Sequence, residues 1–452
     1  MNDFGLSDHE LFPLLDETGS QMLRRLREHP HAPRYNWRTG ERLDAAGLQR
    51  VRDYATAFRR ERRPWQPGHP PIWVEPFARQ CGREVPFYRS RGVADFSDFS
   101  EIPLTRRDDI RRQPCAFVRA GLPIDDLIVY STSGTSGTSL RIPAVPEVPC
   151  RYLPLLEHAL DAVGVRFEGG RRVSLVHVCA QHPTVVLCSV MSHLDGAGFV
   201  KVNLHPDDWR RPEDAVRFLD DCHAEVYTGD PFALAELMKI PLRNQPKALI
   251  SGASALSPGL WEALKAHFQC PVIDLYSSNE SGPIAFATAK DHEILPHDLY
   301  VEIVGADGRP LPPGVRGEIT LTGGINPYLP LVRYAIRDFA ALEYPETSMP
   351  RLTDFHGRKP VAFVNCRGQR FNSVDVTSAL AGLPVPAIHL HQRADGTLLL
   401  RTVSDQEIVA AVRTVLSGLF GAEQPLIVGE PVGTDRTAKP IHYSSGMTGE
   451  GA

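Results

Sequence analysis

The sequence predicts an α/β protein with a large N-terminal domain and a small α+β C-terminal domain. Between about residues 120 and 290, short β-rich runs alternate with longer amphipathic segments, which is typical of a mostly parallel sheet covered by helices. After residue 290 the pattern changes to antiparallel strands joined by short turns, such as Ala306-Asp307-Gly308. The length of 452 residues is enough for two or three domains with substantial cores.

In chain order, the first 115 residues are arginine-rich and predicted to be helical, with one apolar helical face formed by Leu11, Leu14, Leu15, Met22 and Leu23. The strands of the parallel sheet are expected at residues 127–130, 173–178, 185–191, 225–228, 248–251 and 272–276. Its helices are expected at residues 212–222, 231–238 and 258–268.

Antiparallel strands are then expected at residues 300–304, 317–322 and 340–344. Two prolines and a glycine within residues 349–360 predict a linker near Gly357. The remaining strands are expected at residues 362–364, 388–391 and 397–401, with a helix at 405–419. This last set is enough for a small α+β domain.

The overall composition favours small-molecule chemistry. A formal net charge of −5 provides no basic excess for nucleic acid or for an anionic membrane. The eight cysteines form no CxxC pair, which argues against a zinc ribbon or a disulfide framework. The sequence also contains no signal-peptide pattern and no apolar run long enough to span a membrane, so a cytoplasmic protein is expected.

The first functional motif follows the apolar run at residues 127–129 and alternates hydroxyl side chains with glycines. Glycine allows backbone to approach a phosphate closely, and hydroxyl groups donate hydrogen bonds to it. The chain has no lysine before Lys201, so this is not a Walker loop, and an ordinary solvated loop is the alternative. The candidate phosphate-binding residues are Thr132, Ser133, Gly134, Thr135, Ser136 and Gly137.

A second motif, residues 274–282, lies at the carboxyl end of a predicted strand, where open α/β sheets bind ligands. Tyr276 could stack on a base, and Glu280 could hold a divalent ion against phosphate oxygens. The alternative is a polar strand-to-loop junction whose Glu280 faces water.

A third motif, residues 330–338, ends in Asp338, which could accept both hydroxyl groups of a ribose. Asp338 could equally be a local partner of Arg333 or Arg337. A fourth motif contains Lys439, one of only seven lysines beside 42 arginines. Lys439 could supply a mobile positive charge to a reacting phosphate, or it could simply be solvated.

In this order and at these separations, the four motifs resemble the adenylate-forming superfamily, and more closely its phenylacetate-CoA ligase branch. Residues 85–89 and 101–109 are similar to that branch's approach to its phosphate loop, and the resemblance covers about residues 80–442. The resemblance implies that residues 132–137 wrap the ATP phosphates and that Glu280 binds Mg²⁺. It further implies that Lys439 is the catalytic lysine that bridges the carboxylate and the α-phosphate.

The remaining roles also come from the resemblance. Adenine and ribose would be bound by Tyr276, Ser277, Asp338 and Arg358. The acyl pocket would be lined by Ser251, Gly252, Ala253 and His177. The implied domains are a core at residues 1–353 and a mobile lid at residues 354–452. Within the core, residues 1–115 form a helical covering layer, and residues 116–353 form the ATP- and substrate-binding part, with a small β-barrel-like region.

The implied activity is ATP-dependent adenylation of a small carboxylic acid, expected to be aromatic, in secondary or aromatic acid metabolism. The acyl group would then pass to coenzyme A, a carrier protein or another thiol or amine acceptor, with ATP and Mg²⁺ as cofactors. One alternative on the same fold is activation of nitrite for diazotisation of an aryl amine. A second alternative is a catalytically degenerate protein that binds a nucleotide or an acyl group.

The sequence departs from the family pattern at three places. The phosphate loop continues with Thr138 and Ser139 where a lysine is usual, and Arg141 could substitute for it. The hinge reads Lys359-Pro360, and proline restricts backbone rotation there. The structural zinc cysteines of some members are absent from residues 285–291. His292 and His297 are expected at the surface, or, for His297, in a strand-start contact.

Overall fold

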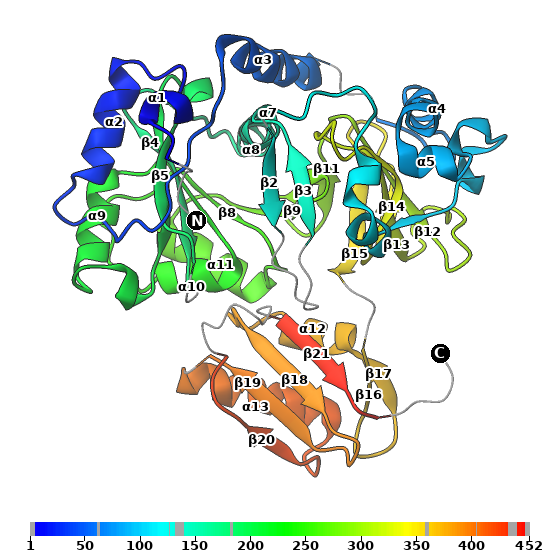
Figure 1. Ribbon diagram of the computed structural model, residues 1–452. Coiled ribbons are helices and arrows are strands. Elements are labelled where there is room, and N and C mark those ends of the chain that lie inside the picture. The colour runs from blue at the N-terminus through cyan, green and yellow to red at the C-terminus, as the bar shows by residue number, and fades with distance from the viewer. Residues whose placement is uncertain are drawn as a thin grey trace.

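The computed structural model describes residues 5–60, 64–125, 127–131, 140–180, 184–357, 361–403, 405–432 and 441–447 (Figure 1). Among these residues, a 13-stranded sheet runs through the large part of the molecule, and a four-stranded sheet lies in the C-terminal part. The strand order of the large sheet is β12-β13-β14-β15-β11-β10-β9-β8-β7-β4-β6-β5, with β1 paired to β14.

The centre of the large sheet is parallel. Its strands are β6 (Ala197–Asn203), β4 (Val173–Cys179), β7 (Val226–Gly229), β8 (Ala248–Ser251) and β9 (Val272–Ser278), with antiparallel β5 (Leu187–Met191) at the edge. These strands are almost continuously apolar because helices cover both of their faces.

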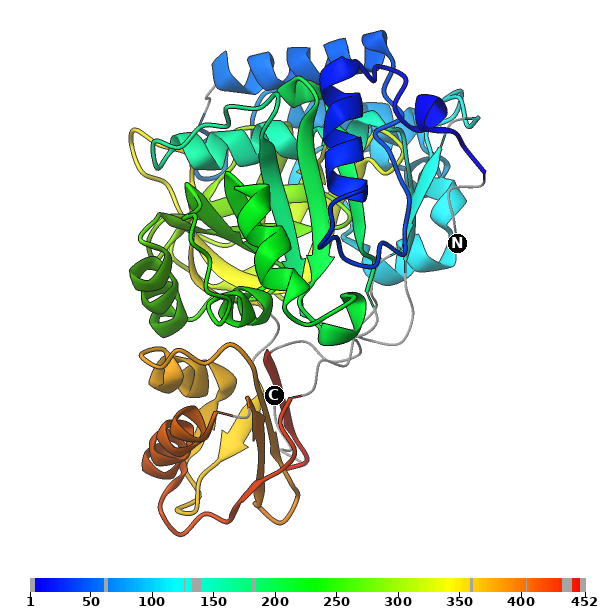
Figure 2. The same cartoon turned by 90° about the vertical axis from the view of Figure 1, so that its left-hand side faces the viewer.

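The two faces have separate apolar clusters. Val176 and Val178 of β4 pack with α2 (Glu17–Arg27), α9 (Asp214–Cys222), α10 (Pro231–Leu237) and α11 (Pro258–Phe268). Leu175, which alternates with them, packs with α7 (Glu147–Cys150) and α8 (Tyr152–Asp161) on the other face. Figure 2 shows α2 lying across the strands at the β5 edge, and α3 (Ala45–Arg60) contacts α7 and α8.

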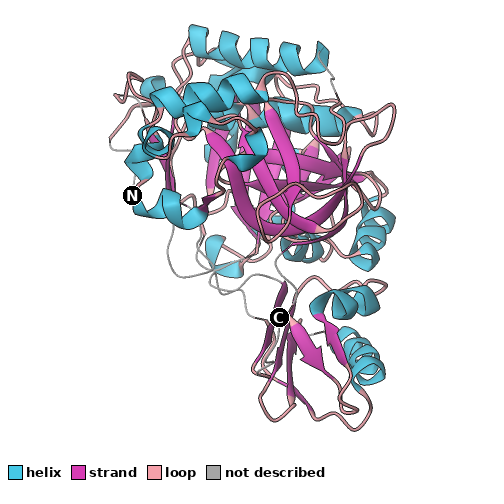
Figure 3. Ribbon diagram, turned by 90° about the vertical axis from the view of Figure 1, so that its right-hand side faces the viewer, coloured by secondary structure: helices cyan, strands magenta, loops and turns pink. Residues whose placement is uncertain are grey.

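The other half of the large sheet is antiparallel and curved (Figure 3). It contains β10 (Gly282–Ala287), β11 (His292–Ile294), β12 (Leu299–Val304), β13 (Gly317–Gly323), β14 (Leu331–Glu343) and β15 (Arg351–Gly357). Its apolar core also includes residues of α4 (Val74–Glu84) and α5 (Pro86–Ser90). The short β1 (Thr105–Arg106) pairs in parallel with β14 and leads into α6 (Arg107–Arg112).

The C-terminal part, residues 361–447, has an apolar cluster of its own that includes Phe363, Leu390 and Phe420. Its four-stranded sheet has the order β20 (Leu426–Val428), β19 (Leu398–Thr402), β18 (Ile388–Gln392) and β21 (Ile441–Ser445). The hairpin of β16 (Ala362–Val364) and β17 (Arg370–Asn372) and the helices α12 (Ser373–Leu380) and α13 (Gln406–Phe420) complete it.

The mixed α/β fold class is confirmed, and several elements differ from the expectation. The strand expected at residues 127–130 is β2 (Ile128–Ser131), which pairs antiparallel with β3 (Arg141–Ala144) and is not part of the parallel sheet. The apolar helical face near the N-terminus is divided, because Pro13 and the N-cap Asp16 separate α1 (Asp8–Leu11) from α2.

Strands β6, β10 and β11 are additional to those expected from the sequence. The linker expected near Gly357 falls at the end of β15, which spans residues 351–357 and so crosses the predicted domain boundary at 353. The division into residues 1–353 and 354–452 therefore stays a prediction.

A close backbone contact joins the C-terminal part to α11. The Gly259 amide donates to the Ala381 carbonyl at 2.7 Å, and the Ser257 hydroxyl donates to the Leu383 carbonyl at 3.3 Å. A Cβ atom at Gly259 would lie 2.5 Å from the carbonyl carbon and oxygen of Leu383. This distance is too short for any side chain, so glycine is required for this docking.

We expect Gly259→Ala to separate the C-terminal part from α11, because the new methyl group meets fixed backbone. Small-angle X-ray scattering should show a larger radius of gyration, and trypsin should release a C-terminal fragment faster by cleaving near Arg351 or Arg358. Gly418→Ala is the matched control, since a Cβ at Gly418 meets nothing within 4 Å. Identical scattering from both variants would contradict this docking contact.

Candidate active site

The strand register brings the predicted site residues of the parallel sheet together near the carboxyl ends of its strands. Gly229 and Ser251, the last residues of β7 and β8, are direct neighbours, and Ser251 also pairs with Asp274 of β9. One step earlier, His177 of β4 lies beside Thr228 of β7. Ligands of open α/β sheets bind at such carboxyl ends, so these positions border one crevice.

Tyr276 and Asp338 come from different motifs and are in direct contact. The Tyr276 hydroxyl donates to Asp338 Oδ2 at 2.9 Å, which joins β9 to β14. Burial, together with the negative charge of Asp338, raises the pKa of Tyr276 well above its ordinary value, so the phenol stays protonated as a donor. The predicted adenine and ribose residues thus lie side by side.

Glu280 is buried and does not face water. Its Oε1 accepts hydrogen bonds from Arg107 Nη1 at 2.5 Å and from the Tyr334 hydroxyl at 3.0 Å, and only 5% of the residue is exposed. Burial and the charge of Glu280 raise the pKa of Tyr334 well above its ordinary value, so this phenol also remains a donor. Glu280 therefore has an arginine and a tyrosine as partners in this structure.

A second group of side chains, Phe355, His292 and Asp274, packs next to Tyr276. The Phe355 ring lies 4.5 Å from the Tyr276 ring and 5.3 Å from the His292 ring, measured between centroids. His292 Nε2 lies 3.2 Å from Asp274 Oδ2, and both residues are buried. The expectation that His292 is a surface residue is wrong, because Asp274 offers it a buried polar partner.

His297 is largely buried, and it forms a hydrogen bond with the beginning of β10. His297 Nε2 donates to the Pro283 carbonyl at 2.9 Å, and burial lowers the pKa of His297 to about 4. The imidazole is therefore neutral near pH 7, and the expected strand-start contact is observed in this form.

Of the residues predicted for the acyl pocket, His177 lies on β4 and Ser251 ends β8, while Gly252 and Ala253 directly follow β8. His177 Nδ1 is 2.7 Å from the Thr228 hydroxyl, and burial lowers the pKa of His177 to about 3, so the ring is neutral. Ser251 is fully buried, and its hydroxyl oxygen has no partner among the described residues. Gly252 donates to the Gly229 carbonyl at 3.0 Å, and Ala253 has a positive φ of 65°.

A positive φ at a residue other than glycine and an unpaired buried hydroxyl are both energetically costly. They occur here within three consecutive residues, at the carboxyl end of β8. Ser277, the remaining predicted nucleotide residue, lies half-buried on β9 opposite Pro283.

Three predicted site elements lie outside the described residues. These are the phosphate-binding residues Thr132 to Gly137, Arg358 and the catalytic Lys439. Their flanking elements are described: β2 and β3 precede and follow the phosphate-binding segment, and β15 ends directly before Arg358. Their roles stay predictions.

Residues close to Lys439 in the sequence line a large cavity between the two parts of the molecule. Its volume is about 810 Å³, and it is lined by residues of α10 and α11 and by C-terminal residues that include Asp405, Ile408 and Val432. Val432 precedes Lys439 by seven positions, and β21 begins two positions after it. Val432, the last described residue before Lys439, therefore lies at this cavity.

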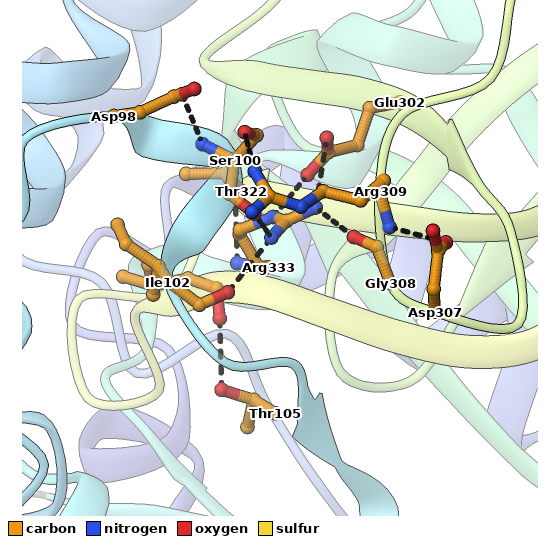
Figure 4. A network of polar contacts seen from close by, with 11 residues as sticks. Asp98, Ser100, Ile102, Thr105, Glu302, Asp307, Gly308, Arg309, Thr322 and Arg333 are labelled. Carbon is orange, nitrogen blue, oxygen red and sulfur yellow. Dashed lines mark hydrogen bonds and ion pairs between the residues drawn. The ribbon is translucent and has the colours of Figure 1, made fainter.

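Arg333 fixes the strand that carries Tyr334. It is 1% exposed, and its Nε lies 2.8 Å from Glu302 Oε1 in a buried ion pair. Its guanidinium also donates to the carbonyls of Ser100, Ile102 and Gly308, which ties the segment before β1 to β14 (Figure 4). Arg333 is thus part of the scaffold that aligns β1, β14 and the Glu280 contact.

Three residues that contact the predicted site residues, Arg107, Tyr334 and Phe355, had no role expected from the sequence. Arg107 and Tyr334 lie inside the segments 101–109 and 330–338 that carry the family resemblance, so a signal was present for these two. Phe355 is in the segment interpreted as a linker, where no pattern pointed to a ring beside Tyr276.

The part of the chain that the structure describes contains neither a metal-binding cluster nor a helix able to span a membrane. No cluster of three or more His, Cys, Asp or Glu side chains could hold a metal ion in that part of the chain. Likewise, none of the helices in the described ranges is long and apolar enough to cross a membrane.

Part of the chain is similar in sequence to known proteins. Residues 170–326 match the family described as AMP-binding enzyme. A phenylacetate-coenzyme A ligase of Aromatoleum evansii is 24% identical over 304 residues, which are 62% of this chain and 67% of that protein.

Solved structures share the fold. A 2-hydroxyisobutyryl-CoA ligase in the postadenylation state with its acyl-AMP has a TM-score of 0.60 at 17% identity, covering 81% of this chain and 87% of its own. An anthranilate CoA ligase in complex with anthranoyl-AMP has a TM-score of 0.50 at 13% identity, covering 71% of this chain and 66% of its own. The predicted adenylate-forming fold is confirmed.

Proposed function

We propose that this chain is an adenylate-forming ligase that converts a small aromatic carboxylic acid into an acyl-AMP and then into a coenzyme A thioester. The observation that carries this proposal is the contact between Tyr276 and Asp338 at the carboxyl end of β9. It joins two motifs that are 62 residues apart in the sequence, at the place where this class of sheet binds nucleotides.

In the proposed complex, adenine lies against Tyr276, and Asp338 accepts hydrogen bonds from the ribose hydroxyls. Asp338 uses Oδ2 for Tyr276, and a carboxylate offers about four lone-pair sites, so both interactions can coexist. Phe355 holds the Tyr276 ring in place through its contact at 4.5 Å. Ser277 and Arg358 are the further residues that we propose for this nucleotide site.

The first half-reaction requires two anions to approach one another. A substrate carboxylate oxygen bonds to the α-phosphorus of ATP, the bond from this phosphorus to the bridging oxygen breaks, and pyrophosphate leaves. The protein contributes positioning and positive charge, which we assign to residues 132–137 and to Lys439. In the second half-reaction the coenzyme A sulfur bonds to the acyl carbon, AMP leaves, and the thiol proton is released.

We also propose Mg²⁺ as the cofactor, held through Glu280. A buried carboxylate oxygen is the ligand type that Mg²⁺ prefers, and Mg²⁺ commonly uses one or two carboxylates together with substrate phosphates. A site with one carboxylate fits this pattern. When bound, the ion neutralises charge on the phosphates that the acid must approach.

The aromatic nature of the acid is the finer part of the proposal. It is supported by the relative named phenylacetate-coenzyme A ligase and by the anthranilate CoA ligase that shares the fold. On this chain we assign the acyl pocket to His177, Ser251, Gly252 and Ala253. The neutral imidazole of His177 and the unpaired hydroxyl of Ser251 suit a largely apolar acid with few polar groups.

The test is a pyrophosphate-release screen with ATP and Mg²⁺ against aryl and alkyl carboxylic acids, with and without coenzyme A. We expect release that depends on an aryl acid, and a coenzyme A thioester as product. Release with alkyl acids alone would contradict the aromatic assignment. Release that depends on nitrite and an aryl amine would replace the proposal with diazotisation, and silence across the panel would favour a protein that only binds nucleotide or acyl groups.

A further inference from the structure

Arg107 is held at a fixed place relative to Glu280 by the backbone. It follows β1, in which Thr105 and Arg106 pair with Tyr334 and Ala335 of β14. The Thr105 hydroxyl also donates to the Val332 carbonyl at 2.8 Å. The strand pairing therefore places Arg107 and Tyr334 together, and both side chains reach the same carboxylate.

The contacts on Glu280 converge on one oxygen. Arg107 Nη1 and the Tyr334 hydroxyl both donate to Oε1, at 2.5 and 3.0 Å. The Glu280 carboxylate is 5% exposed, whereas the Arg107 side chain is 28% exposed. The Arg107 side chain thus retains access to solvent, while the Glu280 carboxylate does not.

A divalent ion at Glu280 would compete with this arrangement. The guanidinium donates into the lone pairs that a metal would use, and two cations on one carboxylate repel each other. The metal must therefore displace Arg107 from Oε1 or bind weakly beside it. Displacement is sterically simple for a long, partly exposed side chain.

We infer that Arg107 is the resident counter-ion of Glu280 and that a divalent cation must displace it in order to bind tightly. This inference rests on the proposed function, because it takes Glu280 as the metal ligand. Arg107 then sets the metal concentration at which the site fills. In the metal-free protein it also keeps a buried carboxylate compensated, which avoids the cost of an unpaired buried charge.

The test measures binding of Mn²⁺ alone to the full chain, without nucleotide, by the electron paramagnetic resonance signal of the free ion. Arg107→Gln should bind Mn²⁺ about tenfold more tightly than the wild-type protein, because the competing charge is gone. Arg111→Gln is the matched control, since Arg111 lies on the same helix and pairs with Asp108 at 3.2 Å. It should bind Mn²⁺ as the wild-type protein does.

The double variant Arg107→Gln/Glu280→Gln shows whether the effect acts through Glu280. The gain in Mn²⁺ affinity expected for Arg107→Gln should be absent from this double variant. Equal affinity in Arg107→Gln and the wild-type protein would overturn the inference, and so would a gain that survives in the double variant. Arg107→Met is a second single variant, which keeps the aliphatic packing if the glutamine variant does not fold. Since no acid or ATP is present, these outcomes are independent of the pyrophosphate screen.

Discussion

Replacing Lys439 with alanine should lower the rate of adenylation by about a hundred- to a thousandfold, which is the typical effect of removing one preorganised donor from a reacting anion. Binding of ATP should largely survive, because adenine and ribose are assigned to Tyr276 and Asp338 on the large part of the molecule. The measurement is acid-dependent pyrophosphate release, together with nucleotide binding by calorimetry. A fall in rate without a fall in affinity identifies a transition-state interaction.

Two further variants define the role of Lys439. Lys265→Ala is the control, because Lys265 is an exposed lysine of α11 that pairs with Glu262. It should adenylate at the wild-type rate. Lys439→Arg should remain strongly impaired, since a planar guanidinium does not replace a compact ammonium on a flexible stem. Wild-type turnover by Lys439→Ala would exclude Lys439 from the mechanism.

The described elements that flank Lys439 in the sequence connect this prediction with the docking of the two parts. The chain leaves the cavity between the two parts at Val432 and enters β21 at Ile441, which pairs with β18 in the centre of the C-terminal sheet. β21, which begins two positions after Lys439, belongs to the C-terminal part, whereas we assign the α-phosphate to the large part. Any change in how the parts dock, such as that expected for Gly259→Ala, should also change the adenylation rate.

The parallel half of the fold was predictable because its strands are uninterrupted apolar runs. Segments 173–178, 248–251 and 272–276 all became strands, and α10 and α11 begin after the N-caps Asp230 and Ser257, each followed by proline. The antiparallel half was less predictable. Strand β10 opens with Gly282 and Pro283, residues that usually end strands, and its pairing to β9 depends on contacts distant in sequence.

The candidate site also contains residues that the sequence predicts and residues that it does not. Tyr276, Glu280 and Asp338 stand out because polar side chains follow or interrupt apolar strands, and that pattern is local. The partners of Glu280 do not stand out, because Arg107 is one of 42 arginines and is 173 residues away in the chain. Only the pairing of β1 with β14 brings it to the carboxylate, and no local pattern encodes this long-range contact.

Replacing Arg333 with methionine should destabilise the protein by about 3–5 kcal/mol, because Glu302 would be left as a buried charge without its partner. Three carbonyls that now accept from the guanidinium, on Ser100, Ile102 and Gly308, would also lose a donor. Denaturant unfolding measures the loss. Arg337→Met is the matched control on the same strand, since the Arg337 side chain is 61% exposed and its pair with Asp108 should contribute under about 1 kcal/mol.

The double variant Arg333→Met/Glu302→Met separates the charge from the hydrogen bonds. Removing both charges should recover part of the loss, since an apolar pair of similar size avoids the desolvation penalty. The part that is not recovered belongs to the unpaired carbonyls that hold the segment before β1 against β14. A loss below about 1 kcal/mol in the single variant would contradict a scaffold role for Arg333. Because β1 positions Arg107, the same variants should loosen the Arg107–Glu280 contact, and the Mn²⁺ affinity of the folded fraction should rise with it.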